Sequence, residues 1–162
     1  MNLRKLFDMQ KVLDQRIIDQ HELDDQELFP NKSLALLVEV GELANEWQGF
    51  KHWKVDPQPK AGMLEEYVDC LHFILSIGND LGFDDNYHSV HGSFQMLNIV
   101  EQFEVIFHTA SSLSVNKTLE NYQNLFELFL GLGEMLGFTT HQIELAYVGK
   151  NTINHTRQES GY

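Results

Sequence analysis

The chain has little cysteine and proline, and it has no long apolar run. Cys70 is the only cysteine among 162 residues, which excludes an internal disulfide and a cysteine-based zinc site. The three prolines stand at positions 30, 57 and 59, so most of the chain is free to be helical. No apolar stretch approaches the roughly 20 residues of a membrane span, and the amphipathic N-terminus does not read as a secretion signal. We therefore expect a cytoplasmic protein without a membrane partner.

Positive charge is also scarce. Lys and Arg total 11 against 24 Asp and Glu, which gives a formal net charge of −13. A surface this acidic repels a polyphosphate backbone, so nucleic acid is excluded as a partner. The excess carboxylates serve solubility alone, or some of them are gathered to hold divalent cations. The length and the apolar share of 43% fit one domain over residues 1–162.

Apolar residues at helical spacing predict an all-α bundle of about six helices, and strand-like alternation is nearly absent. Asn31 or Ser33 is expected to cap the second helix, and Thr139-x-x-Gln142 has the form of a capping box. The predicted helices cover the first twenty residues, a segment from just after Pro30 to Trp47, a segment from Met63 to near Gly82, approximate ranges 87–112 and 116–136, and a last segment from Thr139 or Thr140.

Two carboxylate pairs stand on consecutive predicted helices. Glu39-Val40-Gly41-Glu42 and Glu66-Tyr67-Val68-Asp69 each place two carboxylates one turn apart on one helix face. The neighbouring apolar residues turn that face toward the core, where unpaired carboxylates are costly unless a cation neutralises them. Opposed across two antiparallel helices, the four groups would form a cage of hard oxygen ligands suited to Mg²⁺ or Mn²⁺. Exposed helix charges remain the alternative interpretation.

Motifs spread over both ends of the chain carry a family resemblance. The E-x-x-E and E-x-x-D pairs resemble the metal signature of the all-α NTP pyrophosphatases, the MazG-like superfamily. Together with four further segments they resemble the dimeric dUTP diphosphatases of bacteria, phages and trypanosomatids. These segments are Phe7-x-Met9-Gln10-x-x-Leu13-Asp14, Phe50-Lys51-His52-Trp53-Lys54, Asp69-x-x-His72-Phe73-x-Leu75-Ser76 and Lys150-Asn151-x-x-Asn154-x-x-Arg157-Gln158-x-x-Gly161-Tyr162.

The resemblance implies a MazG-like bundle that forms a homodimer and hydrolyses dUTP, with dUDP as a further candidate substrate, to dUMP. Such an enzyme supplies dUMP and clears dUTP from the nucleotide pool. The implied catalytic and metal-binding residues are Glu39, Glu42, Glu66 and Asp69, which would hold Mg²⁺ with Mn²⁺ as a substitute. By the same resemblance, Glu39 also orients and deprotonates the attacking water.

Substrate contacts are predicted for a further group of residues. Lys150, Asn154 and Arg157 share one helix face and suit a phosphate clamp, although they also suit the helix dipole. Gln10 and Asp14, one turn apart, could read the uracil edge. The remaining predicted contacts are Lys51 to phosphate, Trp53 to the base, His72 and Phe73 to the deoxyribose, and Tyr162 within the C-terminal motif.

Other functions remain open at this point. A member of the same superfamily acting on dCTP or a modified nucleotide would keep the metal residues and reassign only the base contacts. A di-iron helical protein is suggested by Asp69-x-x-His72, but no convincing second motif of that kind exists on another helix. A non-catalytic acidic adaptor is the third alternative.

Overall fold

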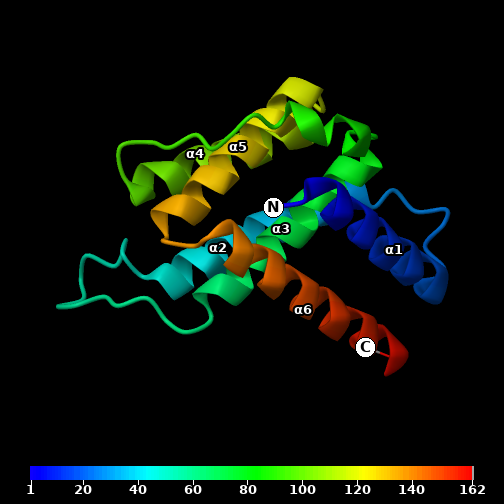
Figure 1. The fold of residues 1–162 in the computed structure, drawn as a ribbon, viewed down its shortest axis with the longest axis horizontal. Helices are drawn as coiled ribbons and strands as arrows, with labels where there is room; N and C mark the ends of the chain where they lie inside the picture. The colour runs from blue at the N-terminus through cyan, green and yellow to red at the C-terminus, as the bar shows by residue number, and fades with distance from the viewer. Residues whose placement is uncertain (162) are drawn as a thin grey trace.

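The computed structural model describes residues 1–161, with backbone alone for residues 87–89. Within this part of the chain the protein is helical and contains no strand, as predicted (Figure 1). None of these described helices is both long and apolar enough to cross a membrane. The elements are α1 (Leu3–His21), α2 (Phe29–Trp47), α3 (Met63–Asp80), the 3₁₀ helix η1 (Asp84–Ser89), α4 (Ile99–Val115), α5 (Leu119–Met135) and α6 (Thr140–Glu159).

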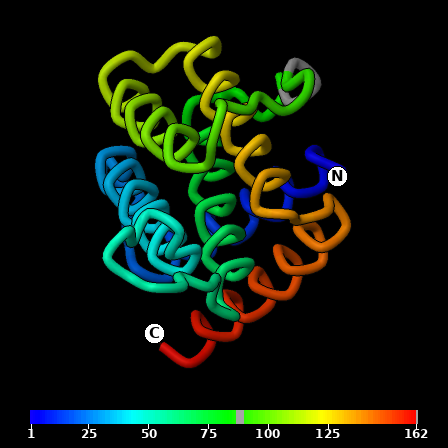
Figure 2. The backbone as a smooth tube through the Cα atoms, turned by 90° about the vertical axis from the view of Figure 1, so that its left-hand side faces the viewer, coloured from blue at the N-terminus to red at the C-terminus, as the bar shows by residue number. Residues whose placement is uncertain are grey.

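Helix α3 is the centre of the bundle, as its apolar sequence predicts. Its buried face includes Val68, Leu71, Ile74 and Leu75, none of which is more than 1% exposed. It packs against α1, α2, α5 and α6, while α4 and α5 pair with each other. Figure 2 shows α3 running between α2 and α4 on one side and α5 and α6 on the other. Side chains on α3 can therefore face several helices at once.

Helices α2 and α3 form an antiparallel pair joined by a loop over residues 48–62, which projects from the bundle in Figure 1. At the open end, Lys32 near the start of α2 bonds Asp80 at the end of α3, at 2.8 Å. At the loop end, the backbone N–H of Lys60 donates to the carbonyl oxygen of Glu46. The pairing brings the two carboxylate motifs opposite each other.

The predicted start of the second helix is wrong by a few residues. Helix α2 begins at Phe29, before Pro30, and its N-cap residue is Leu28 without a side-chain cap. Proline is tolerated here because the first turn leaves its backbone nitrogen without a helical partner in any case. Neither Asn31 nor Ser33 therefore serves as the cap. The capping box predicted for α6, by contrast, is present.

The fourth helix, by contrast, starts later than the predicted residue 87. Helix α4 begins at Ile99, where the Asn98 side chain accepts a hydrogen bond from a backbone N–H in the first turn. The fully buried Gln102 amide donates to the carbonyl of Phe94 and accepts from the N–H of Met96, at 2.9 and 2.7 Å. The N–H of Phe94 also donates to the carbonyl oxygen of Glu127 on α5. Together these bonds hold the preceding segment against α4 and α5, so it does not continue the helix.

Candidate active site

Three carboxylates from the paired helices converge. Glu39 and Glu42 on α2 and Glu66 on α3 each offer one oxygen, and these three atoms lie within 4.8 Å of one another. The i, i+3 spacing on α2 places its two carboxylates on one face, and the antiparallel pairing supplies the third. Among the described residues this is the one such group of acidic or metal-ligating side chains, and it contains no histidine or cysteine. The histidine of the Asp69-x-x-His72 motif is not a member of this group and bonds Gln10 instead.

The negative charge of this cluster is only partly balanced by the residues around it. Burial, followed by the negative charges of Asp69, Glu42 and Glu66, raises the pKa of Glu39 to about 7. Burial and neighbouring carboxylates also raise the pKa of Glu66. The positive charge of Lys150 opposes both rises without offsetting them, so the negative charge of the cluster is only partly balanced. An all-oxygen donor set of high negative charge fits a hard divalent cation such as Mg²⁺ or Mn²⁺.

Asp69, the fourth predicted ligand, lies beside this group and is bound to a lysine. Its carboxylate accepts a hydrogen bond from the Lys150 ammonium on α6, at 2.6 Å, and Glu65 accepts a second at 2.7 Å. Burial raises the pKa of Asp69 although Lys150 opposes this rise. Burial alone would lower the pKa of Lys150, but its hydrogen bonds to the two carboxylates raise it overall. The ammonium of Lys150 thus lies beside Asp69, the last of the four predicted metal ligands.

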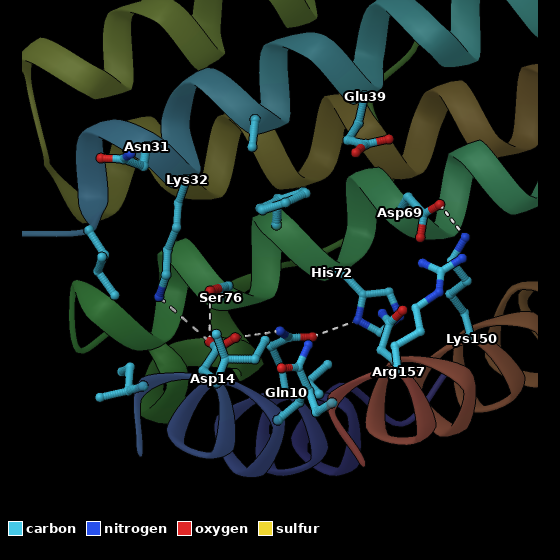
Figure 3. Close-up of a pocket in the computed structure, with 18 of the residues that line it drawn as sticks. Gln10, Asp14, Asn31, Lys32, Glu39, Asp69, His72, Ser76, Lys150 and Arg157 are labelled. Atoms are coloured by element: carbon cyan, nitrogen blue, oxygen red, sulfur yellow. Dashed lines mark hydrogen bonds and ion pairs between the residues drawn. The ribbon is translucent and has the colours of Figure 1, made fainter. Parts of the chain in front are cut away.

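The carboxylates border a cavity of about 520 Å³ enclosed by α1, α2, α3 and α6 (Figure 3). Glu39 and Asp69 line one end of it next to Lys150 and Arg157, and Asp14 lies at the other end. Nine of the residues predicted from the sequence line this cavity: Gln10, Asp14, Glu39, Asp69, His72, Phe73, Lys150, Asn154 and Arg157.

Two of the predicted substrate residues do not line this cavity. Lys51 and Trp53 belong to the loop over residues 48–62 and are absent from the lining, and Trp53 is 64% exposed. Their contacts with substrate stay predictions. Tyr162 lies outside the described residues.

A buried hydrogen-bond network fixes the wall made by α1 and α3. The Gln10 carbonyl oxygen accepts from the Tyr147 hydroxyl at 2.8 Å and from Nδ1 of His72 at 2.7 Å. The Gln10 amide donates to Asp14 at 2.7 Å, and Asp14 accepts a further bond from Ser76. Because an oxygen can only accept, Nδ1 of His72 carries the proton. Gln10 is therefore already engaged, with one amide hydrogen left for a ligand.

His72 is a neutral, ordered part of this wall. Burial lowers its pKa to about 3, and the positive charge of Lys150 acts in the same direction. Its ring stacks on Tyr147 with centroids 4.1 Å apart. Its Nε2 atom is buried and has no hydrogen-bond partner among the described residues. The uncharged ring thus keeps one acceptor unused.

Sequence reasoning missed several residues at the far end of the cavity, above all Lys32, Asn31 and Ser76. A signal was available, because Lys32 precedes Glu39 by seven residues and Ser76 follows Asp69 by seven. Seven residues are two helical turns, so each shares a face with a predicted metal ligand. This spacing alone does not predict a role for Lys32, because the sequence does not show that the two helices border a cavity along that face.

The chain is an all-α bundle with carboxylates and cations around one cavity. A family model described as dUTPase matches residues 2–162, so the chain belongs to this dUTPase family. A search of curated proteins finds no significant match. The family match confirms the predicted family, the all-α fold class and an enzyme activity that hydrolyses dUTP.

Proposed function

We propose that the chain is a Mg²⁺-dependent pyrophosphohydrolase that converts dUTP to dUMP and pyrophosphate. The observation that carries this proposal is the convergence of Glu39, Glu42 and Glu66 beside a cavity that also holds the cations of α6. Phosphoryl transfer asks mainly for positioning and charge neutralisation, and this arrangement provides both next to a pocket of nucleotide size. The product dUMP and the removal of dUTP would be its contribution to the nucleotide pool.

The clustered glutamates would hold the metal, with Asp69 as a further ligand. Mg²⁺, or Mn²⁺ in its place, would supply neutralisation of phosphate charge and a lowered pKa for a bound water. Of the three clustered glutamates only Glu39 lines the cavity. This position supports its assignment as the carboxylate that orients the attacking water and takes its proton.

Lys150, Asn154 and Arg157 form the proposed phosphate clamp. All three line the cavity from α6, at steps of four and three residues that keep them on one face. Lys150 now bonds Asp69 and Glu65. When a triphosphate binds, we expect the ammonium to exchange these carboxylates for phosphate oxygens, which frees Asp69 to act as a ligand.

The opposite end of the cavity suits the nucleoside. Phe73 lines the cavity. It would press against the sugar and would leave no room for a 2′-hydroxyl. The unused acceptor of His72 would take a hydrogen bond from a sugar hydroxyl. Asp14 would accept from the N3–H of uracil. Gln10 would act mainly by holding His72 and Asp14 in place, through the bonds already described.

A homodimer would account for the loop over residues 48–62. Phe50, Trp53 and Val55 expose apolar surface there, and Val55 is fully exposed. A second copy of the chain would cover this surface. Lys51 and Trp53 could then meet the nucleotide in the partner's cavity, which would explain why they do not line the cavity of their own chain.

A substrate panel tests the proposed function. Purified protein is incubated with dUTP, dUDP, dCTP, dTTP or UTP, with Mg²⁺ or with EDTA, and the products are identified by phosphorus NMR. We expect pyrophosphate and dUMP from dUTP in the presence of Mg²⁺, with dUTP preferred over dCTP by about tenfold or more in kcat/KM. Orthophosphate as the primary product would refute the mechanism. Equal turnover of dUTP and dCTP would refute only the base preference.

A further inference from the structure

We propose that Lys32 reads the base, by donating a hydrogen bond to the O4 carbonyl of uracil next to the Asp14 carboxylate that accepts from N3–H. This assignment rests on the proposed function, because it requires that a nucleotide occupies the cavity with its phosphates at the carboxylate cluster. It makes Lys32 a specificity-determining residue in addition to those predicted from the sequence.

The first support is the position of Lys32 along the cavity. It stands seven residues before Glu39 on α2, and Ser76 stands seven residues after Asp69 on α3. At a rise of about 1.5 Å per residue, each pair is separated by roughly 10 Å along its helix. Figure 3 shows Lys32, Ser76 and Asp14 together at one end and Glu39 and Asp69 toward the other. A nucleotide anchored at the metal end by its phosphates would extend its base toward Lys32.

The second support is the way in which the ammonium is held. Only 13% of the Lys32 side chain is exposed, although lysine is usually a surface residue. Its Nζ lies 2.8 Å from an oxygen of Asp80 and 3.8 Å from an oxygen of Asp14. Asp80 does not line the cavity, whereas Lys32 and Asp14 both do. An ammonium has three donors, so the bond to Asp80 fixes its place and leaves donors for a ligand.

Asp14 completes the recognition pair. One of its oxygens accepts from Gln10 and the other from Ser76, both at 2.7 Å. These bonds fix the plane of the carboxylate, and each oxygen keeps a further lone pair. Burial raises the pKa of Asp14, and the positive charge of Lys32 is the largest influence that opposes this rise. Lys32 thus also helps to keep its neighbour ionised, as an acceptor.

A donor beside an acceptor distinguishes the pyrimidines. Uracil presents the C4 carbonyl, an acceptor, next to N3–H, a donor, and both match the pair formed by Lys32 and Asp14. Cytosine presents an amino group next to an unprotonated nitrogen, so both contacts meet the wrong partner. Buried polar groups left unpaired in this way are costly, which makes the discrimination strong. Thymine shares the edge of uracil, so the pair does not distinguish these two bases.

The experiment replaces the ammonium and compares three substrates. Lys32→Met is assayed with dUTP, dTTP and dCTP in the intact protein with Mg²⁺. We expect kcat/KM to fall about tenfold or more for dUTP and by the same factor for dTTP, while that for dCTP does not fall. The control is Lys117→Met, which removes a lysine that lies over Phe29 outside the cavity. It should leave the ratio of dUTP to dCTP unchanged.

Equal losses for all three nucleotides, or an unchanged dUTP to dCTP ratio in Lys32→Met, would overturn the assignment and leave Lys32 a structural ion-pair partner. Sulfur is a weaker acceptor than oxygen, so the unaltered protein provides a second test that does not depend on folding of the variant. It should turn over 4-thio-dUTP less efficiently than 2-thio-dUTP, and the reverse order or no difference would contradict the O4 contact. If the unaltered protein hydrolyses no dUTP, the proposed function itself fails, which is a distinct result.

Discussion

Replacing Glu39 with Gln should stabilise the metal-free protein at pH 8. Burial and the like charges of Asp69, Glu42 and Glu66 raise the pKa of Glu39 from 4.5 to about 7. Above pH 7 the folded protein must therefore hold an ionised carboxylate in an unfavourable place. Glutamine keeps the shape of the side chain without its charge. The same substitution removes a proposed metal ligand, so it should weaken the stabilisation that Mg²⁺ provides.

The sign and size of this change in stability follow from proton linkage. Between pH 4.5 and about 7, Glu39 is protonated in the folded protein and ionised in the unfolded chain. The free energy of unfolding of the metal-free protein therefore falls as pH rises through this window and levels off above it. For a fully buried group, this fall in the free energy of unfolding would be about 3.4 kcal/mol, at about 1.36 kcal/mol per pH unit. Because Glu39 is partly exposed, solvent screening reduces the expected contribution to about 1–2 kcal/mol.

Urea denaturation at pH 4.5 and pH 8, in EDTA or Mg²⁺ and at one protein concentration, measures both effects. At pH 8 without metal, we expect the free energy of unfolding of Glu39→Gln to exceed that of the unaltered protein by about 1–2 kcal/mol. Near pH 4.5 the two free energies should be equal. Excess Mg²⁺ should stabilise the unaltered protein by about 2.7 kcal/mol at 100 times its Kd, and the variant by less. Glu104→Gln, on the exposed face of α4, is the control and should change stability by less than about 0.5 kcal/mol. A variant less stable than the unaltered protein at pH 8 in EDTA would refute the reasoning.

Four other predictions concern activity, stability and assembly. Glu66→Ala should slow pyrophosphate release from dUTP about 100-fold or more, because it removes a metal ligand, and a near-normal rate would count against the cluster. Arg157→Ala should raise KM for dUTP, dCTP and dTTP alike in steady-state assays, whereas a base-selective effect would contradict its place at the phosphates. Gln10→Ala should cost about 1–3 kcal/mol in urea denaturation, because the buried Nδ1–H of His72 loses its acceptor and the Tyr147 hydroxyl keeps only its longer bond to the Leu6 carbonyl. An unchanged stability would contradict that network. Sedimentation should give a mass near twice 18.8 kDa, and a monomer at micromolar concentration would refute the homodimer.

The sequence predicted the helical fold well where local signals were strong. The apolar spacing of α3 and the capping box of α6 are local features, and both are present as predicted. The start of α4 depends on contacts with α5, because the N–H of Phe94 donates to the carbonyl oxygen of Glu127 and the Gln102 amide donates to that of Leu128. The apolar spacing within the segment 87–98 does not indicate these contacts, so the predicted helix is too long.

The candidate site was predictable to the extent that its residues share a helix face. Glu39 and Glu42 stand one turn apart, and their convergence with Glu66 needed only the antiparallel pairing of α2 and α3. The bond between Asp69 and Lys150 joins residues 81 positions apart in the chain. The cluster around Lys32 likewise joins three helices, α1, α2 and α3. Only the tertiary structure brings such residues together.

The most direct test of the central claim is the metal dependence of dUTP hydrolysis. Protein freed of metal is given dUTP, and pyrophosphate release is followed while Mg²⁺ is added, with Glu66→Ala measured in parallel. We predict no release in EDTA, a saturable recovery with Mg²⁺ in the unaltered protein, and at most about 1% of that rate in the variant at the same Mg²⁺. Hydrolysis of dUTP at the same rate in EDTA, or full recovery in the variant, would contradict the claim that the carboxylate cluster holds a catalytic metal.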